Sequence, residues 1–230
     1  MRRNELTPTK AWIYAGLVLA GGVGAACLVS SLKKPLIKKG DRILLVGDSL
    51  SVGLRFPLSA LAKESGFELK HIGKEGTAMN AWSADTGHGA SLNGELSGWR
   101  PSVVLVSLGT NDEAIKKYNP SANVVTQQAP YLTRLLAKVR ASGAQVLWIG
   151  PPANTFMSPE LRKLIRESVG ADHYFPSEKY DLQKQPDGIH PTVKGYGAWG
   201  GAIWRWLETG KAPASVAPVA PGLALAGRRR

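Results

Sequence analysis

Cysteine is nearly absent from this chain of 230 residues. Its one cysteine, Cys27, excludes an intramolecular disulfide framework and any zinc site built from several cysteines. Aromatic residues are also scarce at 7%, but 43% of the residues are hydrophobic, so a wholly disordered chain is excluded. No internal repeat is visible. A chain of this length without covalent crosslinks depends on a hydrophobic core, and we expect one globular domain with short appendages.

Acidic residues are too few to balance the basic ones, and the formal net charge is +12. The surplus lies at the two ends, because residues 1–39 hold seven Lys or Arg against one Glu and residues 210–230 hold four against none. Residues 40–209 keep 18 basic and 16 acidic side chains. A nucleic-acid-binding domain concentrates positive charge on its folded part. The distribution therefore argues against a nucleic-acid partner and favours charges that flank a membrane segment and a solvated tail.

Charged residues are missing altogether from Ala11–Leu32. As a helix, these 22 residues would reach about 33 Å, which is enough to cross the hydrocarbon core of a bilayer. We favour a transmembrane signal-anchor with an extracytoplasmic domain behind it, although lysines after the segment leave its orientation open. Two alternatives remain. One is a signal peptide cleaved near Gly24–Ala26, and the other is a lipoprotein signal that ends at Cys27.

The pattern of charge and hydropathy divides the chain into five parts. These are a basic N-terminal segment (1–10), the transmembrane anchor (11–32), a basic linker (33–40), a folded domain (41–209) and an Ala/Pro-rich tail (210–230). The tail shows no periodicity and is predicted to be disordered.

The predicted domain alternates short apolar runs with amphipathic segments, a pattern typical of βα units around a parallel sheet, so the predicted fold class is α/β. Strands are predicted at Arg42–Val46, Phe67–Ile72, Pro101–Ser107, Gln145–Ile149 and His173–Phe175. Helices are predicted over Leu50–Ser65 with an interruption near Pro57, over Ala122–Ser142, and over Thr192–Glu208 with its Trp and Tyr side chains used for packing.

Side chains suited to chemistry follow the predicted strands. Ser49 follows the first strand in Gly-Asp-Ser, Gly76 lies in a loop after the second, and Asn111 follows the third in Gly-Thr-Asn-Asp. Asp187 and His190 share the segment Asp-Gly-Ile-His-Pro before the last helix. Because the active site of an open α/β sheet lies beyond the carboxyl ends of its strands, we expect these residues to converge. A hydroxyl, amide donors, a carboxylate and an imidazole together are the inventory of acyl transfer.

Each of these side chains has a candidate role. The hydroxyl of Ser49 needs a base, and His190 is the candidate because imidazole titrates near neutral pH. Asp187, three residues earlier, is the candidate to orient that imidazole. Asn111 can donate to an oxyanion, and Gly76 allows the backbone to approach a substrate closely. Taken singly they could be a helix cap and turn residues, but four such blocks in one order favour catalysis.

The four blocks resemble those of the SGNH (GDSL) hydrolase superfamily over residues 41–208. The resemblance implies a flavodoxin-like three-layer α/β/α sandwich with a central parallel sheet and a triad of Ser49, His190 and Asp187. It implies no metal and no organic cofactor. The implied oxyanion hole consists of the backbone N–H groups of Ser49 and Gly76 and the side chain of Asn111.

The function we favour is that of a membrane-tethered serine esterase that forms an acyl-enzyme and removes O-acetyl groups from a carbohydrate. A lysophospholipase, an acyl-thioesterase or an O-acyltransferase would use the same residues. A catalytically inactive, tethered carbohydrate-binding or scaffold protein is the alternative from another class. The sequence does not indicate the oligomeric state.

Several further residues are candidates for the surroundings of the site. His71 lies in a predicted strand and is expected to be structural, whereas His88 is a candidate to approach the substrate. Loop residues that could line a substrate pocket are Trp82, Trp99, Tyr118, Phe156 and Met157.

Overall fold

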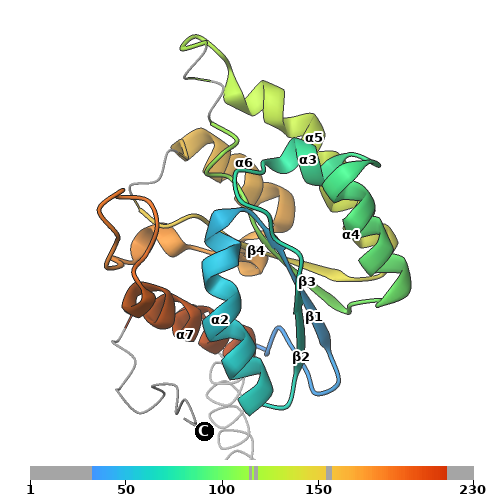
Figure 1. Ribbon diagram of the computed structural model, residues 1–230, viewed down its shortest axis with the longest axis vertical. Helices are drawn as coiled ribbons and strands as arrows, with labels where there is room; N and C mark the ends of the chain where they lie inside the picture. The colour runs from blue at the N-terminus through green and yellow to red at the C-terminus, as the bar shows by residue number, and fades with distance from the viewer. Residues whose placement is uncertain (1–32, 114–115, 117–118, 154–156, 217–230) are drawn as a thin grey trace, which may run out of the picture. The chain divides into compact units, whose positions relative to one another are not determined.

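The computed structural model describes residues 33–113, 116, 119–153 and 157–216 (Figure 1). The predicted transmembrane anchor lies outside the described residues, and within them no helix is both long and apolar enough to cross a bilayer. The chain divides into two units, Met1–Lys34 and Pro35–Arg230. The fold and the site described below belong to the second unit.

Five parallel strands form one sheet in the order β2-β1-β3-β4-β5. All five lie where the hydrophobic pattern predicts strands, and pairs such as Ile43 with Val103 and Leu105 with Leu147 set the register of the three central ones. This order is that of the flavodoxin-like fold, as the resemblance implied. The strands are β1 (Arg42–Gly47), β2 (Glu68–His71), β3 (Val103–Ser107), β4 (Gln145–Ile149) and β5 (Tyr174–Phe175).

Helices cover both faces of the sheet and make the three-layer sandwich. Helices α2 and α7 pack on one face, whereas α3, α4, α5 and α6 pack on the other (Figure 1). Their bounds are α2 (Ser49–Glu64), α3 (Met79–Ser83), α4 (Gly87–Gly98), α5 (Val124–Ala141), α6 (Pro159–Val169) and α7 (Val193–Thr209).

The sheet separates two hydrophobic cores. Successive residues of a strand point to opposite faces, so Ile43 and Leu45 of β1 join the core under α2 and α7, while Leu44 and Val46 join the other core. Both faces are buried, and the strands are therefore nearly continuous apolar runs. The three tryptophans of α7 are buried, which confirms that they serve packing.

One feature of α2 differs from the prediction. The helix runs through Pro57 without the expected interruption. Proline removes one helical hydrogen bond, but here its ring packs against Gly200 of α7, where an added Cβ would lie 2.7 Å from the Pro57 ring. Close packing of α2 on α7 thus compensates for the lost hydrogen bond and keeps the helix continuous.

The packed structure extends beyond residues 41–209 on both sides. The backbone N–H groups of Leu36 and Ile37 donate to the carbonyl of Leu207 at 2.8 and 3.3 Å, and Ile37 is buried. Beyond α7, the hydroxyl of Tyr180 donates to the carbonyl of Pro213 at 2.7 Å. Residues on both flanks of the predicted domain therefore contact its core.

The edge of the sheet that carries the strand carboxyl ends has a topological switch point between β1 and β3. From β1 the chain crosses through α2 to β2 on one side, and β3 then pairs with β1 on the other side. Loops after the two neighbouring strands diverge there, and ligands of open α/β sheets bind at such a switch point.

Candidate active site

Ser49 is the first residue of α2, and only Asp48 separates it from the end of β1. Asp48 caps the helix, because its Oδ1 accepts the N–H of Leu50 at 2.9 Å. A side chain at Gly47 would place a Cβ 2.2 Å from the carbonyl oxygen of Ser107, so only glycine lets β1 run this close to β3. The tight strand-to-helix turn sets the Ser49 hydroxyl at the switch point. It also leaves the first N–H groups of α2 without helical acceptors.

His190 connects the Ser49 hydroxyl to a carboxylate. Its Nε2 lies 2.8 Å from the Oγ of Ser49, and its Nδ1 lies 2.6 Å from the Oδ2 of Asp187. Asp187 accepts at Nδ1, so Nδ1 carries the ring proton and Nε2 is left as an acceptor for the serine hydroxyl. The three residues predicted to form a triad are thus joined by two hydrogen bonds.

The carboxylate of Asp187 is held in its charged form. A hydrogen bond from the imidazole of His190, then the backbone N–H groups of His190 and Ile189, lower the pKa of Asp187 to about 2. Its side chain is 43% exposed, so burial opposes the charge only weakly. The carboxylate therefore remains ionised, and it can stabilise an imidazolium, throughout the physiological range of pH.

The loop before α7 fixes the place of His190. The carbonyl of His190 accepts the N–H of Gln185 at 2.7 Å, and the N–H of Thr192 donates to the carbonyl of Gln183 at 2.9 Å. These two hydrogen bonds join the beginning of the loop to its end. Thr192 then caps α7, since its Oγ1 accepts the N–H of Gly195 at 3.1 Å. His190 stands two residues before this cap, on a loop anchored at both ends.

The loop after β2 and the loop after β3 meet beside the serine turn. The N–H of Lys74 donates to the carbonyl of Gly47 at 2.9 Å, and the Nδ2 of Asn111 donates to the carbonyl of Thr77 at 3.0 Å. Asn111 Nδ2 also lies 3.4 Å from Oδ2 of Asp48. Gly76 has a φ of +72° and open space where a Cβ would lie, so its backbone is accessible. The blocks of Ser49, Gly76 and Asn111 thus come together, with the Asn111 amide turned towards Thr77 and Asp48.

Two buried carboxyl groups, those of Asp48 and Asp112, lie at this junction. They were not among the site residues predicted from the sequence. Burial raises the pKa of Asp48 to about 7, and this effect outweighs the helix-cap hydrogen bond from Leu50, which lowers it. Burial likewise raises the pKa of Asp112 to about 6, although its Oδ1 accepts the N–H of Met79 at 2.9 Å. The aspartate that ends Gly-Thr-Asn-Asp was the available signal for Asp112. Burial of both groups, with a smaller repulsion of Asp48 by Asp112, favours their protonated forms up to nearly neutral pH.

Comparison with known protein families shows the family to which a chain with this arrangement belongs. The model of the GDSL-like lipase/acylhydrolase family matches residues 45–198. The chain belongs to this family. The SGNH resemblance is confirmed, and the GDSL-like protein is a serine ester hydrolase by family.

Solved structures share the fold of this GDSL-like hydrolase. TesA is 23% identical, with a TM-score of 0.55 over 74% of this chain and 99% of its own. The acetyl xylan esterase AlAXEase is 17% identical, with a TM-score of 0.53 over 71% and 98%. The esterase EstA from Pseudoalteromonas sp. is 21% identical, with a TM-score of 0.50 over 73% and 98%. The comparison with curated proteins gives no significant match.

The remaining histidines of the GDSL-like hydrolase lie outside the triad. Nε2 of His71 accepts the N–H of Gly73 at 3.1 Å, and burial lowers the pKa of His71 to about 4, so the ring is neutral and structural, as predicted. His88 lies on α4 with its ring against Trp82, at 5.3 Å between centroids. His173 precedes β5, and its Nε2 lies 3.4 Å from Nε2 of Gln145, at the amino end of the sheet.

The residues expected to line a substrate pocket from loops do not all lie in loops, and some of them are buried. Trp82 is a buried residue of α3 rather than part of a loop, and its Nε1 donates to Oγ1 of Thr77 at 2.9 Å, so it supports the loop that carries Gly76. Met157 is also buried. Trp99 ends α4 and is half-buried. Tyr118 and Phe156 lie outside the described residues.

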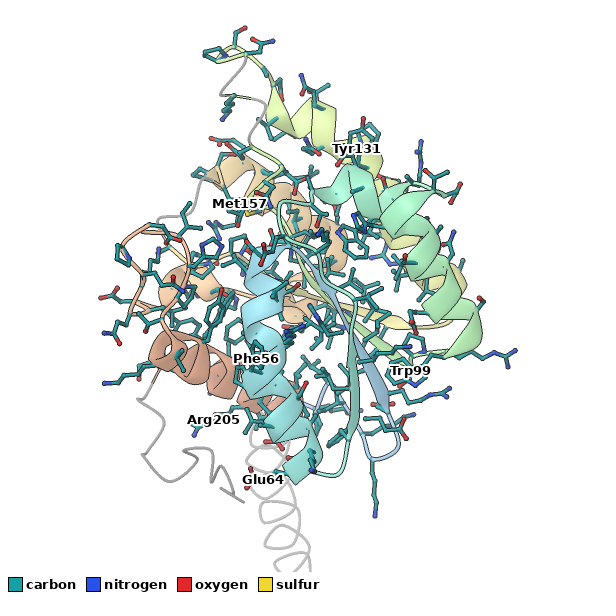
Figure 2. All side chains as sticks on the ribbon, viewed as in Figure 1. Phe56, Glu64, Trp99, Tyr131, Met157 and Arg205 are labelled. Atoms are coloured by element: carbon teal, nitrogen blue, oxygen red, sulfur yellow. The ribbon has the colours of Figure 1, made fainter. Side chains whose placement is uncertain are left out.

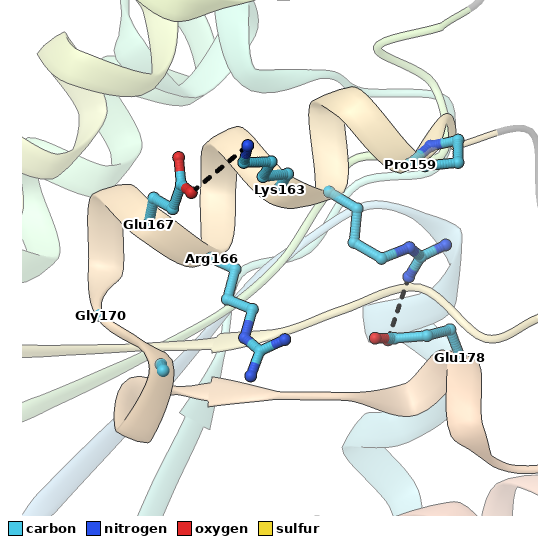
Figure 3. A pocket seen from close by; sticks show the side chains of 8 residues that line it. Pro159, Lys163, Arg166, Glu167, Gly170 and Glu178 are labelled. Atoms are coloured by element: carbon cyan, nitrogen blue, oxygen red, sulfur yellow. Dashed lines mark hydrogen bonds and ion pairs between the residues drawn. The ribbon is translucent and has the colours of Figure 1, made fainter.

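Two cavities accompany these elements. One, of about 420 Å³, adjoins Asn111 and lies between α3 and α5. The other, of about 540 Å³, lies beside α6 (Figure 3), and four of its charged side chains form two ion pairs, Arg162 with Glu178 at 3.1 Å and Lys163 with Glu167 at 3.9 Å. Nowhere in the part of the chain that the structure describes do three or more His, Cys, Asp or Glu residues gather as a metal site would require.

Proposed function

We propose that Ser49 is the nucleophile, His190 the general base and Asp187 the group that orients and stabilises the imidazole. The observation that carries this proposal is the bridging position of His190, whose two ring nitrogens lie 2.8 Å from the Ser49 hydroxyl and 2.6 Å from the Asp187 carboxylate. Serine hydroxyls need such a base within hydrogen-bond reach to attack an ester.

The reaction proceeds in two halves. Oγ of Ser49 attacks the ester carbonyl carbon while its proton passes to Nε2 of His190, and the charge of Asp187 stabilises the imidazolium. The imidazolium then protonates the departing alkoxide, so the alcohol leaves and an acyl-serine remains. Water, deprotonated by the same imidazole, attacks the acyl carbonyl and releases the carboxylic acid together with free Ser49.

The negative oxygen of each tetrahedral intermediate needs donors on the side away from His190. The N–H of Ser49 at the start of α2 and the N–H of Gly76 are the backbone candidates. The amide of Asn111 is the third, because the N–H that makes only the long 3.4 Å contact with Asp48 is available to an oxyanion. The shorter bond to Thr77 holds the amide in place.

We infer a carbohydrate O-acetyl ester as the substrate, and a membrane tether through residues 11–32 with the catalytic domain on the extracytoplasmic side. The tether is supported by the uncharged length of that segment. The carbohydrate is supported by the shared fold of the acetyl xylan esterases among the solved structures. A polar cavity next to Asn111 supports it further.

Hydrolysis of a series of chromogenic esters, from acetyl to octanoyl, tests the proposal. Ser49→Ala should abolish turnover and still fold, since Asp48 rather than Ser49 caps α2 and alanine is favourable inside a helix. Ser97→Ala, on the exposed side of α4, is the matched control and should retain full activity. Turnover by a folded Ser49→Ala protein would disprove the mechanism, and a preference for octanoyl over acetyl esters would replace the carbohydrate ester with a lipid ester.

A further inference from the structure

The 420 Å³ cavity beside Asn111 is lined almost entirely by neutral polar side chains. It lies where α3 contacts α5, on the face of the sheet opposite α2 and α7 (Figure 1). The side chains that matter here are Asn80, Asn111, Asp112, Gln127, Gln128 and Tyr131. Asn111 belongs both to this cavity and to the loop junction beside Ser49, so the cavity adjoins the place where the ester would react.

The composition of the lining favours a neutral ligand with many hydroxyl groups. Carboxamides offer both donors and acceptors, as sugar hydroxyls require, and four of the six side chains are carboxamides. No Lys, Arg or His takes part in the described lining, so nothing there would neutralise a phosphate or a carboxylate. Large aliphatic side chains that would bury a long acyl chain do not take part either.

The amide of Gln128 is held in one orientation behind the cavity. Nε2 of Gln128 donates to the carbonyl of Asp112 at 3.1 Å, and this bond fixes the orientation of the amide. Among the described residues, Oε1 of Gln128 and Oδ2 of Asp112 have no hydrogen-bond partner, although Gln128 is only 8% exposed and Asp112 only 1%. Both oxygen atoms are themselves shielded from solvent, so they lie behind the cavity surface and the ligand contacts fall to the other carboxamides.

We propose that this cavity is the subsite for the sugar ring that carries the ester. Tyr131, half-buried on α5 (Figure 2), presents an aromatic surface for one face of the ring, and the carboxamides of Asn80 and Gln127 reach its hydroxyls. The inference rests on the proposed function, because Asn111 orients the reacting carbonyl next to the ring. The subsite thus selects a neutral saccharide ester over a long-chain lipid ester.

Direct binding to the full chain with Ser49→Ala tests this subsite without any turnover. The protein is kept in a detergent without a sugar headgroup and titrated with xylobiose, cellobiose and diacetylchitobiose, and in parallel with octanoate and inorganic phosphate. We expect saturable binding of at least one disaccharide and none of the two anions. Adding Gln127→Leu or Tyr131→Leu should weaken disaccharide binding at least fivefold. Gln145→Leu, the same change at the amino end of β4, should leave it unchanged.

The outcomes separate this inference from the mechanism. Three results would each overturn the saccharide subsite. They are no binding of any of the three disaccharides, tighter binding of octanoate than of the disaccharides, and disaccharide affinities of the folded Gln127→Leu and Tyr131→Leu variants that equal that of the Ser49→Ala parent. Hydrolysis of chromogenic esters by the wild-type chain and its loss in Ser49→Ala test the triad independently. An active esterase that binds no disaccharide would refute the subsite alone, and a disaccharide-binding chain without esterase activity would refute the mechanism alone.

Discussion

Two aspartates near Ser49 show how the surroundings decide the state of a carboxyl group. Asp187 is largely exposed, and three hydrogen bonds lower its pKa to about 2. Asp48 stands next to Ser49 in the sequence and accepts a helix-cap hydrogen bond, yet burial raises its pKa to about 7. Desolvation outweighs hydrogen bonding at Asp48, and the reverse holds at Asp187. The carboxylate that assists the imidazole is therefore the exposed one.

Replacing Asp187 by Asn should lower kcat by roughly 10²- to 10⁴-fold. The amide would lose the negative charge that stabilises the imidazolium, and its NH₂ group would disturb the tautomer in which Nε2 of His190 accepts from Ser49. Initial rates with a saturating acetyl ester measure the effect. Asp181→Asn, on an exposed residue outside the triad, is the control and should keep the wild-type kcat. A kcat within threefold of wild type for Asp187→Asn would remove Asp187 from the mechanism.

The buried carboxyl of Asp112 should make stability depend on pH. Its pKa in the fold is about 6, above the usual 3.8, so the protonated form is favoured. The stability that this proton contributes is fully present below about pH 4 and is lost as the pH rises through about 6. In Asp112→Asn the side chain is neutral at every pH. We expect its unfolding free energy, relative to wild type, to rise by roughly 2–3 kcal/mol between pH 4 and pH 7.5.

Urea denaturation at several pH values measures this difference. Asp181→Asn serves again as the control, since Asp181 is exposed and its replacement should give a difference that does not change with pH. If the Asp112→Asn difference were constant from pH 4 to pH 7.5, the carboxyl would have an ordinary pKa in the fold and the desolvation argument would be wrong.

At the scale of helices, α2 and α7 approach each other through small residues. A Cβ at Gly53 of α2 would lie 2.1 Å from the ring of Tyr196 in α7, so Gly53→Ala should destabilise the fold by roughly 1–3 kcal/mol through overpacking. Gly94 is also inside a helix, α4, but nothing lies within 4 Å of its would-be Cβ. Gly94→Ala should therefore stabilise the protein by about 0.5–1 kcal/mol. Thermal unfolding should give opposite signs for the two variants, and equal signs would contradict the packing argument.

The sheet was predicted from the sequence, but half of the described α-helices, α3, α4 and α6, were not. Strands buried on both faces are short apolar runs, which are visible without any tertiary information. In contrast, α4 has glycines at both ends and in its interior and buries only Leu92 and Leu96 as large apolar residues, so it gives no helical period. Helix α3 is five residues long. Helix α6 did carry a signal, with Ser158 as its cap and Leu161, Ile165 and Val169 on one face.

The site was predictable to the extent that its residues follow strands. Ser49, Gly76 and Asn111 each come shortly after a strand, and parallel strands bring such residues to one edge. The sugar subsite has no comparable pattern. Asn80 lies on the short helix α3 and Gln127 on α5, and only the contact between these two helices brings them together. Polar residues that meet through helix packing leave no local mark in the sequence.

At the scale of the whole molecule, the proposed tether predicts how the chain partitions. The described part from Pro35 on has its own two hydrophobic cores, so a chain that begins at Pro35 should fold. Expressed in a bacterial host, the full chain should sediment with membranes and resist extraction by 1 M salt, because a hydrophobic span rather than charge would hold it. The chain from Pro35 should stay in the supernatant with equal specific activity. Release of the full chain by salt would show attachment by the basic residues instead.

The sheet of this esterase places the catalytic residues and the sugar subsite on different hydrophobic cores, which allows the two to evolve separately. The nucleophile starts α2 and the base precedes α7, both on one core, whereas the sugar subsite is built by α3 and α5 on the other core. Substitutions at the subsite positions Asn80, Gln127 and Tyr131 leave the packing under Ser49 and His190 in place, whereas Trp82 of α3 must be kept because it supports the loop of Gly76. Selection, or a directed library confined to those three positions, can therefore exchange one sugar for another while the hydrolytic apparatus stays intact.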